Sequence, residues 1–529
     1  MIRSVVALLL AGSLLPSLHG LEAQERSDSV TLYTAGLGDL GRRVDTDDGT
    51  SQAYFDQGLQ LMYAFAVDEG LQSFQRSSQA DPGCAMCAWG EAWAWGPYLN
   101  GPMDPEEEPH GYEAAQRAAA LAREGGVSPV ERDLIEAMAI RYAPEPDEDG
   151  RAVRDSAYAE AMARVFQDHP TDLEVGTLYG ESLMLLEPRR GTWPLTKPSV
   201  QRIHRVLEET LARDLSHPGA CHLYIHATES TPDAGKAEPC AELLGTSIPG
   251  ASHINHMPSH TYNRIGRWGD AVRANQMAWH SDQKAAINEG FAIYPSHNLH
   301  MLLFAASMDG QGAVAVQAGK DYGKLVEGGQ FYHALALLRF GRFDEILDLE
   351  VRPENAVFQG LWEFALGYAH LREGDPDSAQ AYLDGMRMLI REQGDSIQFR
   401  GHTATQLLGV TSGILEAEIL RSEGRSAQAI EVLETAVELE DGLRYDEPEP
   451  LPFSARHWLG SVLLDEDRPV EAEEVYRIAL EDHPNNGWSL FGLAQALDAQ
   501  GRPGDALLVR REFDASWERA DIWLQTSHF

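Results

Sequence analysis

The chain has 529 residues and a formal net charge of −40 at pH 7, from 42 basic and 82 acidic residues. This charge argues against a nucleic-acid partner and against binding to anionic lipid surfaces, because both need a basic protein face. Cationic ligands match the charge better, although a highly acidic surface also serves solubility alone.

The first 23 residues have the pattern of a secretory signal peptide. Arg3 precedes an apolar run from Val5 to Leu15. The small residue Ala23 then provides a cleavage site for a signal peptidase. The run is shorter than the roughly 20 residues that cross a bilayer, and we expect no transmembrane segment after it. The sequence therefore predicts a periplasmic or secreted protein, with a signal peptide at 1–23 and an N-terminal extension at 24–50.

Four cysteines stand in the chain, at Cys84, Cys87, Cys221 and Cys240. In an oxidising compartment they allow two disulfides with three alternative pairings, of which Cys84 with Cys87 and Cys221 with Cys240 is the simplest. The first two also have the CxxC spacing of redox motifs. No strand–helix–strand pattern surrounds them and no basic residue lies nearby to lower a thiol pKa, so we do not expect a redox role.

From residue 51 onward the pattern is one of amphipathic helices joined by short turns that contain glycine or proline. The clearest unit runs from Phe453 to Pro484, where Gly460, Ala472 and Tyr476 stand at the offsets of the 34-residue tetratricopeptide repeat. Small residues let two helices cross closely, and the larger residue fills the space beside them. The sequence predicts an all-α fold, a right-handed α-solenoid of tetratricopeptide-like helical hairpins.

An acidic, proline-bearing stretch from Asp441 to Pro452 has the composition of a linker. We therefore divide the mature chain near residue 445. Residues 51–445 are predicted to form a divergent repeat solenoid with a histidine-rich centre, and residues 446–529 to form C-terminal tetratricopeptide repeats.

Three histidine-rich strings lie in the middle of the chain: HPGACHLYIHATE from residue 217, HINHMPSH from residue 253 and HNLH from residue 297. In the first string, Pro218 suits the first position of a helix. His222, His226 and Glu229 then follow at i, i+4 and i+7, on one face of that helix. The candidate metal ligands from the three strings are His222, His226, His253, His256, His260, His297 and His300.

The second and third strings also place histidines near helix starts. In the second, Pro258 opens a helix, which leaves the first two histidines of the string in the loop before it. In the third, Ser296 caps a helix on which His297 and His300 stand three residues apart, on one face. Each string thus contributes at least a pair of imidazoles.

Six imidazoles delivered as pairs suit a dinuclear transition-metal site better than a lone zinc ion, which needs only four ligands. Imidazole without thiolate favours copper, zinc or iron, and an oxidising setting makes copper or zinc the expected metal. A di-iron site would add carboxylates, for which Glu229, Glu91 and Glu181 are the candidates. Glu229 and Tyr224 are the candidate catalytic residues, and Glu229 could equally orient an imidazole. The alternative is a buried imidazole hydrogen-bond network without metal.

The same region resembles a family of secreted bacterial tetratricopeptide-like proteins. The matching strings extend from Cys84 to His300, and they include CAMC, LYGESL, HPGA, HLYIH, HMPSH and HNLH. The resemblance implies a helical-repeat scaffold around a polar centre, and it assigns no activity.

Two classes of function follow from these patterns. In the first, the repeats wrap a pocket over the histidines and bound metal activates water or dioxygen; copper would imply an oxidoreductase and zinc a hydrolase. In the second, the concave groove binds a small molecule, a peptide or a partner protein, and the histidine cluster is structural. Self-assembly is compatible with both classes. An open coordination position would distinguish them, since structural metal sites are closed.

Overall fold

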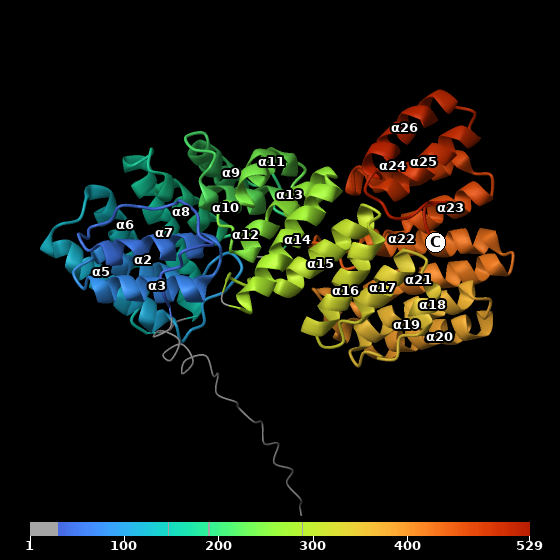
Figure 1. Cartoon of the computed structure of the whole chain (residues 1–529), viewed down its shortest axis with the longest axis horizontal. Coiled ribbons are helices and arrows are strands. Elements are labelled where there is room, and N and C mark those ends of the chain that lie inside the picture. Colours follow the sequence, from blue (N-terminus) through green and yellow to red (C-terminus); the bar gives the residue numbers. More distant parts are fainter. Residues whose placement is uncertain (1–29, 146–147, 189–190, 288) are drawn as a thin grey trace, which may run out of the picture.

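The computed structural model describes residues 30–145, 148–188, 191–287 and 289–529, so the predicted signal peptide lies outside the described residues. The fold is an all-α helical solenoid (Figure 1), as the sequence predicts. The strands in the described part are β1 (Gln398–Phe399) and β2 (His402–Thr403), which form one short antiparallel hairpin. Within the same residues, no helix combines the length and apolar character needed to cross a membrane.

Consecutive helices pack against one another along the chain, as in other repeat solenoids. The N-terminal part consists of α2 (Gly49–Tyr63), α3 (Val67–Ala80), α4 (Ala85–Ala94), α5 (Glu108–Glu124), α6 (Pro129–Ile140), α7 (Glu148–Asp168), α8 (Leu173–Met184) and α9 (Pro198–Leu211). The middle consists of α10 (Pro218–Glu229), η1 (Ala234–Ala237), α11 (Glu238–Leu244), α12 (Ser252–His256), α13 (Pro258–Ile265), α14 (Trp268–Ala285) and α15 (Pro295–Met308).

The C-terminal part begins after the histidine-rich strings. It consists of α16 (Gly312–Leu325), α17 (Phe331–Arg339), α18 (Phe343–Leu347), α19 (Ala356–Arg372), α20 (Pro376–Gln393), η2 (Gly394–Ser396), α21 (Ala404–Ser422), α22 (Ser426–Asp441), α23 (Arg456–Asp465), α24 (Pro469–Asp482), α25 (Gly487–Ala499) and α26 (Pro503–Ser516). The core is one continuous apolar cluster that extends through all three parts.

The predicted repeat at 453–484 forms the hairpin of α23 and α24. A Cβ at Gly460 would lie 2.4 Å from Cζ of Tyr476, and one at Gly492 on α25 would lie 2.2 Å from the same atom. Both helices thus approach the buried tyrosine ring too closely for any side chain. This contact is the physical reason for the spacing that identifies the repeat.

The C-terminal repeats pack back onto the middle of the chain. Trp268 Nε1 donates to the carbonyl of Pro484 at 2.9 Å, and Trp488 Nε1 donates to the carbonyl of Ser307 at 2.8 Å. Figure 1 shows the same proximity, with the red C-terminal helices beside α14 and α15. The stretch from 442 to 455, between α22 and α23, is thereby brought against the histidine-bearing helices. The division into two domains near residue 445 remains a prediction.

Two disulfides link the four cysteines, Cys84 to Cys87 and Cys221 to Cys240. The first lies at the start of α4, where Cys84 is the N-cap residue. The second joins α10, which carries two of the candidate histidines, to α11. The second disulfide therefore ties a histidine-bearing helix to its neighbour.

Replacing Gly460 by alanine is expected to destabilise the C-terminal repeats, because the new methyl group overlaps the ring of Tyr476. Overpacking of this kind costs about 1–3 kcal/mol of unfolding free energy, which thermal or denaturant unfolding will measure. Gly504→Ala is the matched control, since nothing lies within 4 Å of the Cβ it would add. Equal stability of the two variants would contradict the packing account.

Candidate metal centre

Local sequence features position the histidine-bearing helices. Pro218 occupies the start of α10 as predicted, and the His217 side chain caps that helix by accepting from the backbone N–H of Ala220 at 3.1 Å. Two details differ from the sequence analysis. The first two histidines of the second string lie in a short helix, α12, and not in a loop. The third string begins its helix at Pro295, so Tyr294, not Ser296, precedes it.

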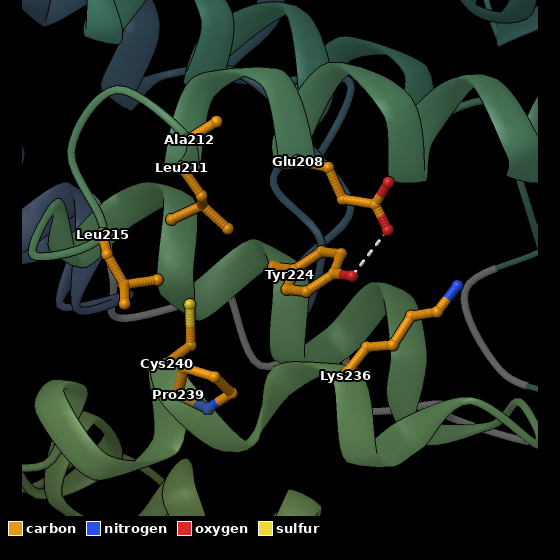
Figure 2. Close-up of a pocket in the computed structure, with 8 residues that line it drawn as sticks. All are labelled: Glu208, Leu211, Ala212, Leu215, Tyr224, Lys236, Pro239 and Cys240. Carbon is orange, nitrogen blue, oxygen red and sulfur yellow. Dashed lines mark hydrogen bonds between the residues drawn. The ribbon is translucent and has the colours of Figure 1, made fainter.

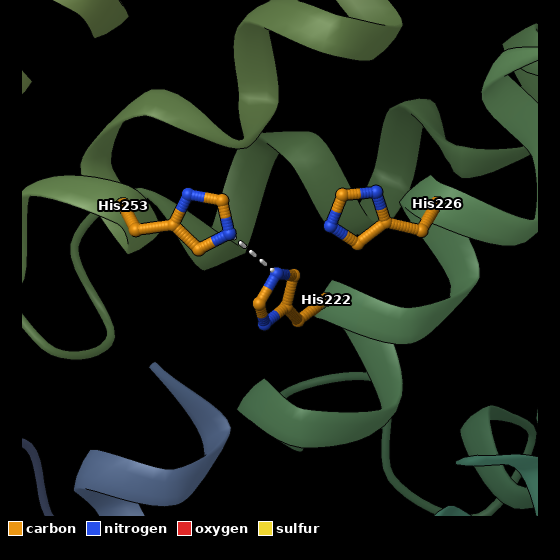
Figure 3. Close-up of side chains that lie close together, drawn as sticks. All are labelled: His222, His226 and His253. Carbon is orange, nitrogen blue, oxygen red and sulfur yellow. Dashed lines mark hydrogen bonds between the residues drawn. The ribbon is translucent and has the colours of Figure 1, made fainter. Parts of the chain in front are cut away.

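One group of three imidazoles, here called the first triad, consists of His222, His226 and His253 (Figure 3). Their nearest nitrogens all lie within 4.8 Å of one another, and all three residues are buried. The Nε2 atoms of His222 and His253 are 3.1 Å apart. Ligand nitrogens at 2.0–2.1 Å around one tetrahedral metal would be about 3.3 Å apart. The first triad therefore has the dimensions of a three-imidazole metal site.

A second triad consists of His256, His260 and His297. The Nε2 atoms of His256 and His260 are 2.7 Å apart, and His297 is the one member of the six that is partly exposed. The two triads adjoin: the ring centroids are 5.7 Å apart between His253 and His256, and 5.6 Å apart between His226 and His260. Six of the seven candidate histidines thus form one continuous cluster.

The outer nitrogens of two imidazoles are held by uncharged acceptors. His222 Nδ1 donates to the backbone carbonyl of Tyr63 at 2.6 Å, and His256 Nδ1 donates to Asn275 Oδ1 at 2.7 Å. The Asn275 amide is itself oriented, because its Nδ2 donates to the carbonyl of Ala271 at 2.8 Å. A proton fixed on Nδ1 leaves Nε2 unprotonated and free to bind a metal, as in many metalloproteins.

Two carboxylates contact the outer nitrogens of two further imidazoles, those of His226 and His260. Glu229 Oε1 lies 2.8 Å from His226 Nδ1, and its other oxygen contacts His260 Nδ1. Glu447 Oε2 lies 3.0 Å from the same atom of His260. Glu229, His260 and Glu447 also form a third group of potential ligands, on the Nδ1 side of that imidazole. In the observed geometry the carboxylates orient imidazoles through their outer nitrogens, whereas two pairs of Nε2 atoms, one in each triad, face each other.

The protonation of the cluster follows from burial and from these carboxylates. Burial, with repulsion from neighbouring imidazoles, lowers the pKa well below its usual range for His222, His253, His256 and His297. Burial also lowers the pKa of His226 to about 3. For His260 burial acts in the same direction, but Glu229 and Glu447 outweigh it and raise the pKa to about 10. Five imidazoles are therefore neutral at pH 7, which is the form that binds metal.

Two buried nitrogens in the first triad have no hydrogen-bond partner among the described residues, His253 Nδ1 on the outer side and His226 Nε2 on the inner side. A buried acceptor without a partner is costly, and the position of His226 Nε2 among two other imidazole nitrogens is that of a ligand atom. The donor set, its spacing and this orphaned nitrogen together fit a transition-metal ion.

Backbone strain is concentrated around the cluster. Five described residues other than glycine have positive φ, and three of them surround the histidines: Phe65 (60°), Tyr294 (54°) and Arg400 (54°). The Phe65 ring lies 4.3 Å from that of His222 and is stacked on that of His226. The Tyr294 ring meets His253 edge to face at 5.2 Å. Such conformations persist where the surroundings enforce them, and they are typical of functional sites.

His300 and Glu91 do not belong to the centre, which corrects the prediction that they are metal ligands. His300 Nε2 shares a hydrogen bond of 2.6 Å with the hydroxyl of Tyr332, outside the three groups of potential ligands. It lies three residues after His297, and this spacing turns its side chain to a different neighbour. Glu91 pairs with Arg117 at 2.7 Å near the start of the chain.

Glu181 and Tyr224 are likewise directed elsewhere. Glu181 accepts a hydrogen bond from Trp93 Nε1 at 3.1 Å in the N-terminal core. The Tyr224 hydroxyl donates to Glu208 at 2.7 Å and lines a shallow surface cavity of about 370 Å³ (Figure 2). Tyr224 is on the helix of the first triad but faces away from it, so the predicted catalytic role at the metal is withdrawn. Of the predicted carboxylates, Glu229 alone reaches the cluster.

Sequence reasoning misses Glu447 and Asn275. Glu447 is 187 residues from its partner His260, and no local pattern connects them. Asn275 offers a usable signal, because it is a polar residue on the buried, alanine-rich face of α14. A buried asparagine requires a hydrogen-bond partner, and here the partner is an imidazole.

No protein-family model and no curated protein matches the chain. Among solved structures it is similar to the human IFIT1 dimer with m7Gppp-AAAA, at 10% identity over 94% of each chain with a TM-score of 0.32. It is also similar to the TPR domain of P58(IPK), at 10% identity over 85% of this chain and 98% of that chain with a TM-score of 0.21. Naa15/Naa10 bound to HypK-THB is similar at 14% identity over 90% and 71%, with a TM-score of 0.23. These similarities are too distant to inform the site, and the resemblance to secreted bacterial repeat proteins stays a prediction.

Asn275→Leu is expected to weaken metal binding at the second triad, because His256 Nδ1 then loses its close acceptor. Loss of such an outer partner typically costs about 10–100-fold in metal affinity, which competition with a chelator of known affinity will measure. Tyr224→Phe is the control, since its hydroxyl contacts only Glu208 among the described residues. If the metal affinity of the Asn275 variant is unchanged, the Asn275 amide does not orient His256 for metal binding.

Proposed function

We propose that the two triads bind a pair of transition-metal ions and that the protein is a metal-dependent oxidoreductase with copper as its metal. The observation that supports this most directly is the juxtaposition of two three-imidazole groups, each of which contains a pair of Nε2 atoms that face each other. A closed structural zinc site needs four protein ligands, whereas three protein ligands leave a position for water or substrate.

The donor set favours copper over zinc and iron. First-row divalent metals bind a given nitrogen site with affinity that rises to copper and then falls at zinc. Iron sites of the non-haem type include a carboxylate ligand, and here Glu229 and Glu447 approach only the Nδ1 side of the imidazoles. An all-imidazole set is therefore best matched by copper, with a zinc hydrolase as the alternative.

The two disulfides support an oxidising, extracytoplasmic location, since such bonds are rare in proteins of the cytosol. This agrees with the signal-peptide pattern at residues 1–23. We propose a periplasmic or secreted protein on these two grounds.

A bound copper pair would supply electron-transfer chemistry toward dioxygen or a reducing substrate. The surrounding residues prepare the site for it. Tyr63, Asn275, Glu229 and Glu447 hold protons on the outer nitrogens. The buried Phe65 ring packs against all three imidazoles of the first triad. His297 is partly exposed, so the second triad is the one that faces solvent. We therefore propose that substrate reaches the metal centre at the second triad.

Metal analysis by plasma mass spectrometry on protein prepared from a periplasmic fraction without an affinity tag tests the proposal. We expect about two equivalents of copper, because each triad supplies three ligands. His226→Ala and His297→Ala each remove one ligand from a different triad and should each lose about one equivalent. His300→Phe is the matched control, since this buried histidine lies outside both triads.

If the protein instead contains stoichiometric zinc that copper does not displace, the oxidoreductase proposal is wrong and a zinc hydrolase is the better interpretation. Absence of metal, even after loading, would make the histidines a structural hydrogen-bond network. The helical-repeat scaffold would then be the functional part, with a peptide or protein as its ligand.

Copper-loaded protein is expected to consume dioxygen when a reductant such as ascorbate is present, because copper held by the two triads would pass electrons from ascorbate, which is oxidised, to dioxygen, which is reduced. An oxygen electrode measures the rate. Zinc-loaded protein and copper-loaded His226→Ala should show at most the rate of free copper at the same concentration. Equal rates for all three would contradict an oxidoreductase.

A further inference from the structure

A cavity of about 420 Å³ with charged and apolar lining residues lies next to the segment that carries Glu447, which contacts His260 of the second triad. Arg264 of α13, residues of the 440–456 stretch and the end of α24 line it. It forms where the C-terminal repeats pack back onto the middle of the chain. Its volume lies within the range of small-molecule sites, about 300–1,000 Å³.

Most carboxylates in the cavity wall already have a partner. The ion pairs are Asp446 with Arg400 at 2.5 Å, Asp441 with Arg456 at 2.7 Å and Glu449 with His483 at 3.3 Å. Glu440 accepts a hydrogen bond from Ser454 Oγ at 2.7 Å, and Asp482 is exposed to solvent. The acidic residues of the wall therefore leave little buried negative charge unpaired.

Arg264 forms no ion pair at contact distance with a described residue, and its charge acts only at longer range on the carboxylate of Glu449, which also lines the cavity. Its Nε is buried without a hydrogen-bond partner among the described residues. Its guanidinium carbon lies 6.0 Å from the ring centroid of Tyr445, a contact that leaves the N–H groups unused. Arg444, in the same wall, is exposed and donates to the carbonyl of Gly401. An unpaired guanidinium facing a cavity is suited to a carboxylate, which it binds through two parallel hydrogen bonds.

The rest of the lining is suited to an apolar group. Tyr445, Leu451, Phe453 and Ile478 contribute rings and aliphatic carbons to the same cavity. We propose that the cavity binds a small organic carboxylate, with its anionic group on Arg264 and its apolar body against Tyr445 and Phe453. The net charge of −40 repels anions at long range, but salt at physiological strength screens exposed charges beyond about 8 Å.

The cavity is adjacent to the metal centre. The Tyr445 hydroxyl, in the cavity wall, lies 3.4 Å from Glu447 Oε2, and that oxygen lies 3.0 Å from His260 Nδ1. Arg264 is one helical turn from His260 on α13. A carboxylate held there would lie beside the second triad, which makes small organic carboxylates the substrate class. This last step rests on the proposed oxidoreductase function, whereas the ligand site itself does not.

Isothermal titration of the metal-free full chain with benzoate and with hexanoate tests the site. We expect saturable binding of one equivalent, and binding about tenfold or more weaker in Arg264→Met, because a charge-assisted hydrogen bond is lost. Arg444→Met should bind within about twofold of the unmodified protein, since that arginine lies at the exposed rim. Benzyl alcohol, which lacks the carboxylate, should bind at least about tenfold more weakly than benzoate.

Circular dichroism of each variant verifies folding, and Arg264→Lys, which keeps the charge, should retain measurable binding. No binding of either carboxylate to the unmodified protein, or equal loss in the Arg264 and Arg444 variants, would overturn the site. Because the titration uses metal-free protein, its result is independent of the metal analysis, so failure of one proposal is distinguishable from failure of the other.

Discussion

The central constraint on this molecule is the burial of five imidazoles, with a sixth partly exposed beside them, in the interior of a helical-repeat protein. Each neutral ring has one N–H that needs an acceptor, and an unsatisfied polar group in the core costs about 1–3 kcal/mol. The acceptors come from distant parts of the chain: the carbonyl of Tyr63, the amide of Asn275, and the carboxylates of Glu229 and Glu447. Satisfying the outer nitrogens of His222, His226, His256 and His260 in this way turns the inner nitrogens of these rings toward the cluster, which is the arrangement that a metal requires.

This constraint explains why the solenoid does not behave as a simple row of repeats. In a linear array each repeat contacts only its neighbours, and a residue near position 447 would lie far from one at position 260. Here the C-terminal repeats pack on α14 and α15 through Trp268 and Trp488, and Arg400 holds Asp446 and the backbone of Glu447. The scaffold and the site are thus mutually dependent, since the same contacts that close the fold also deliver a carboxylate to His260.

The fold class and six of the seven histidines could be predicted from the sequence because both rest on local spacing. Pro218 and the i, i+4 interval fix the first helix face, and Gly460 with Tyr476 fixes the repeat. His300 could not be separated from His297 by spacing alone, since the direction of each side chain depends on which helix packs opposite. Sequence motifs alone suggest Glu91 and Glu181 as ligands, and in the structure each contacts a residue outside the cluster. Glu447 depends on a tertiary contact across 187 residues, which no local pattern records.

The measurement that tests the account most directly is a crystal structure of the copper-loaded protein with diffraction data collected on both sides of the copper absorption edge. The account predicts two anomalous peaks, each within bonding distance of three imidazole Nε2 atoms, one in the triad of His222, His226 and His253 and one in the triad of His256, His260 and His297. A single peak among Glu229, His260 and Glu447, or no peak within the cluster, would contradict it.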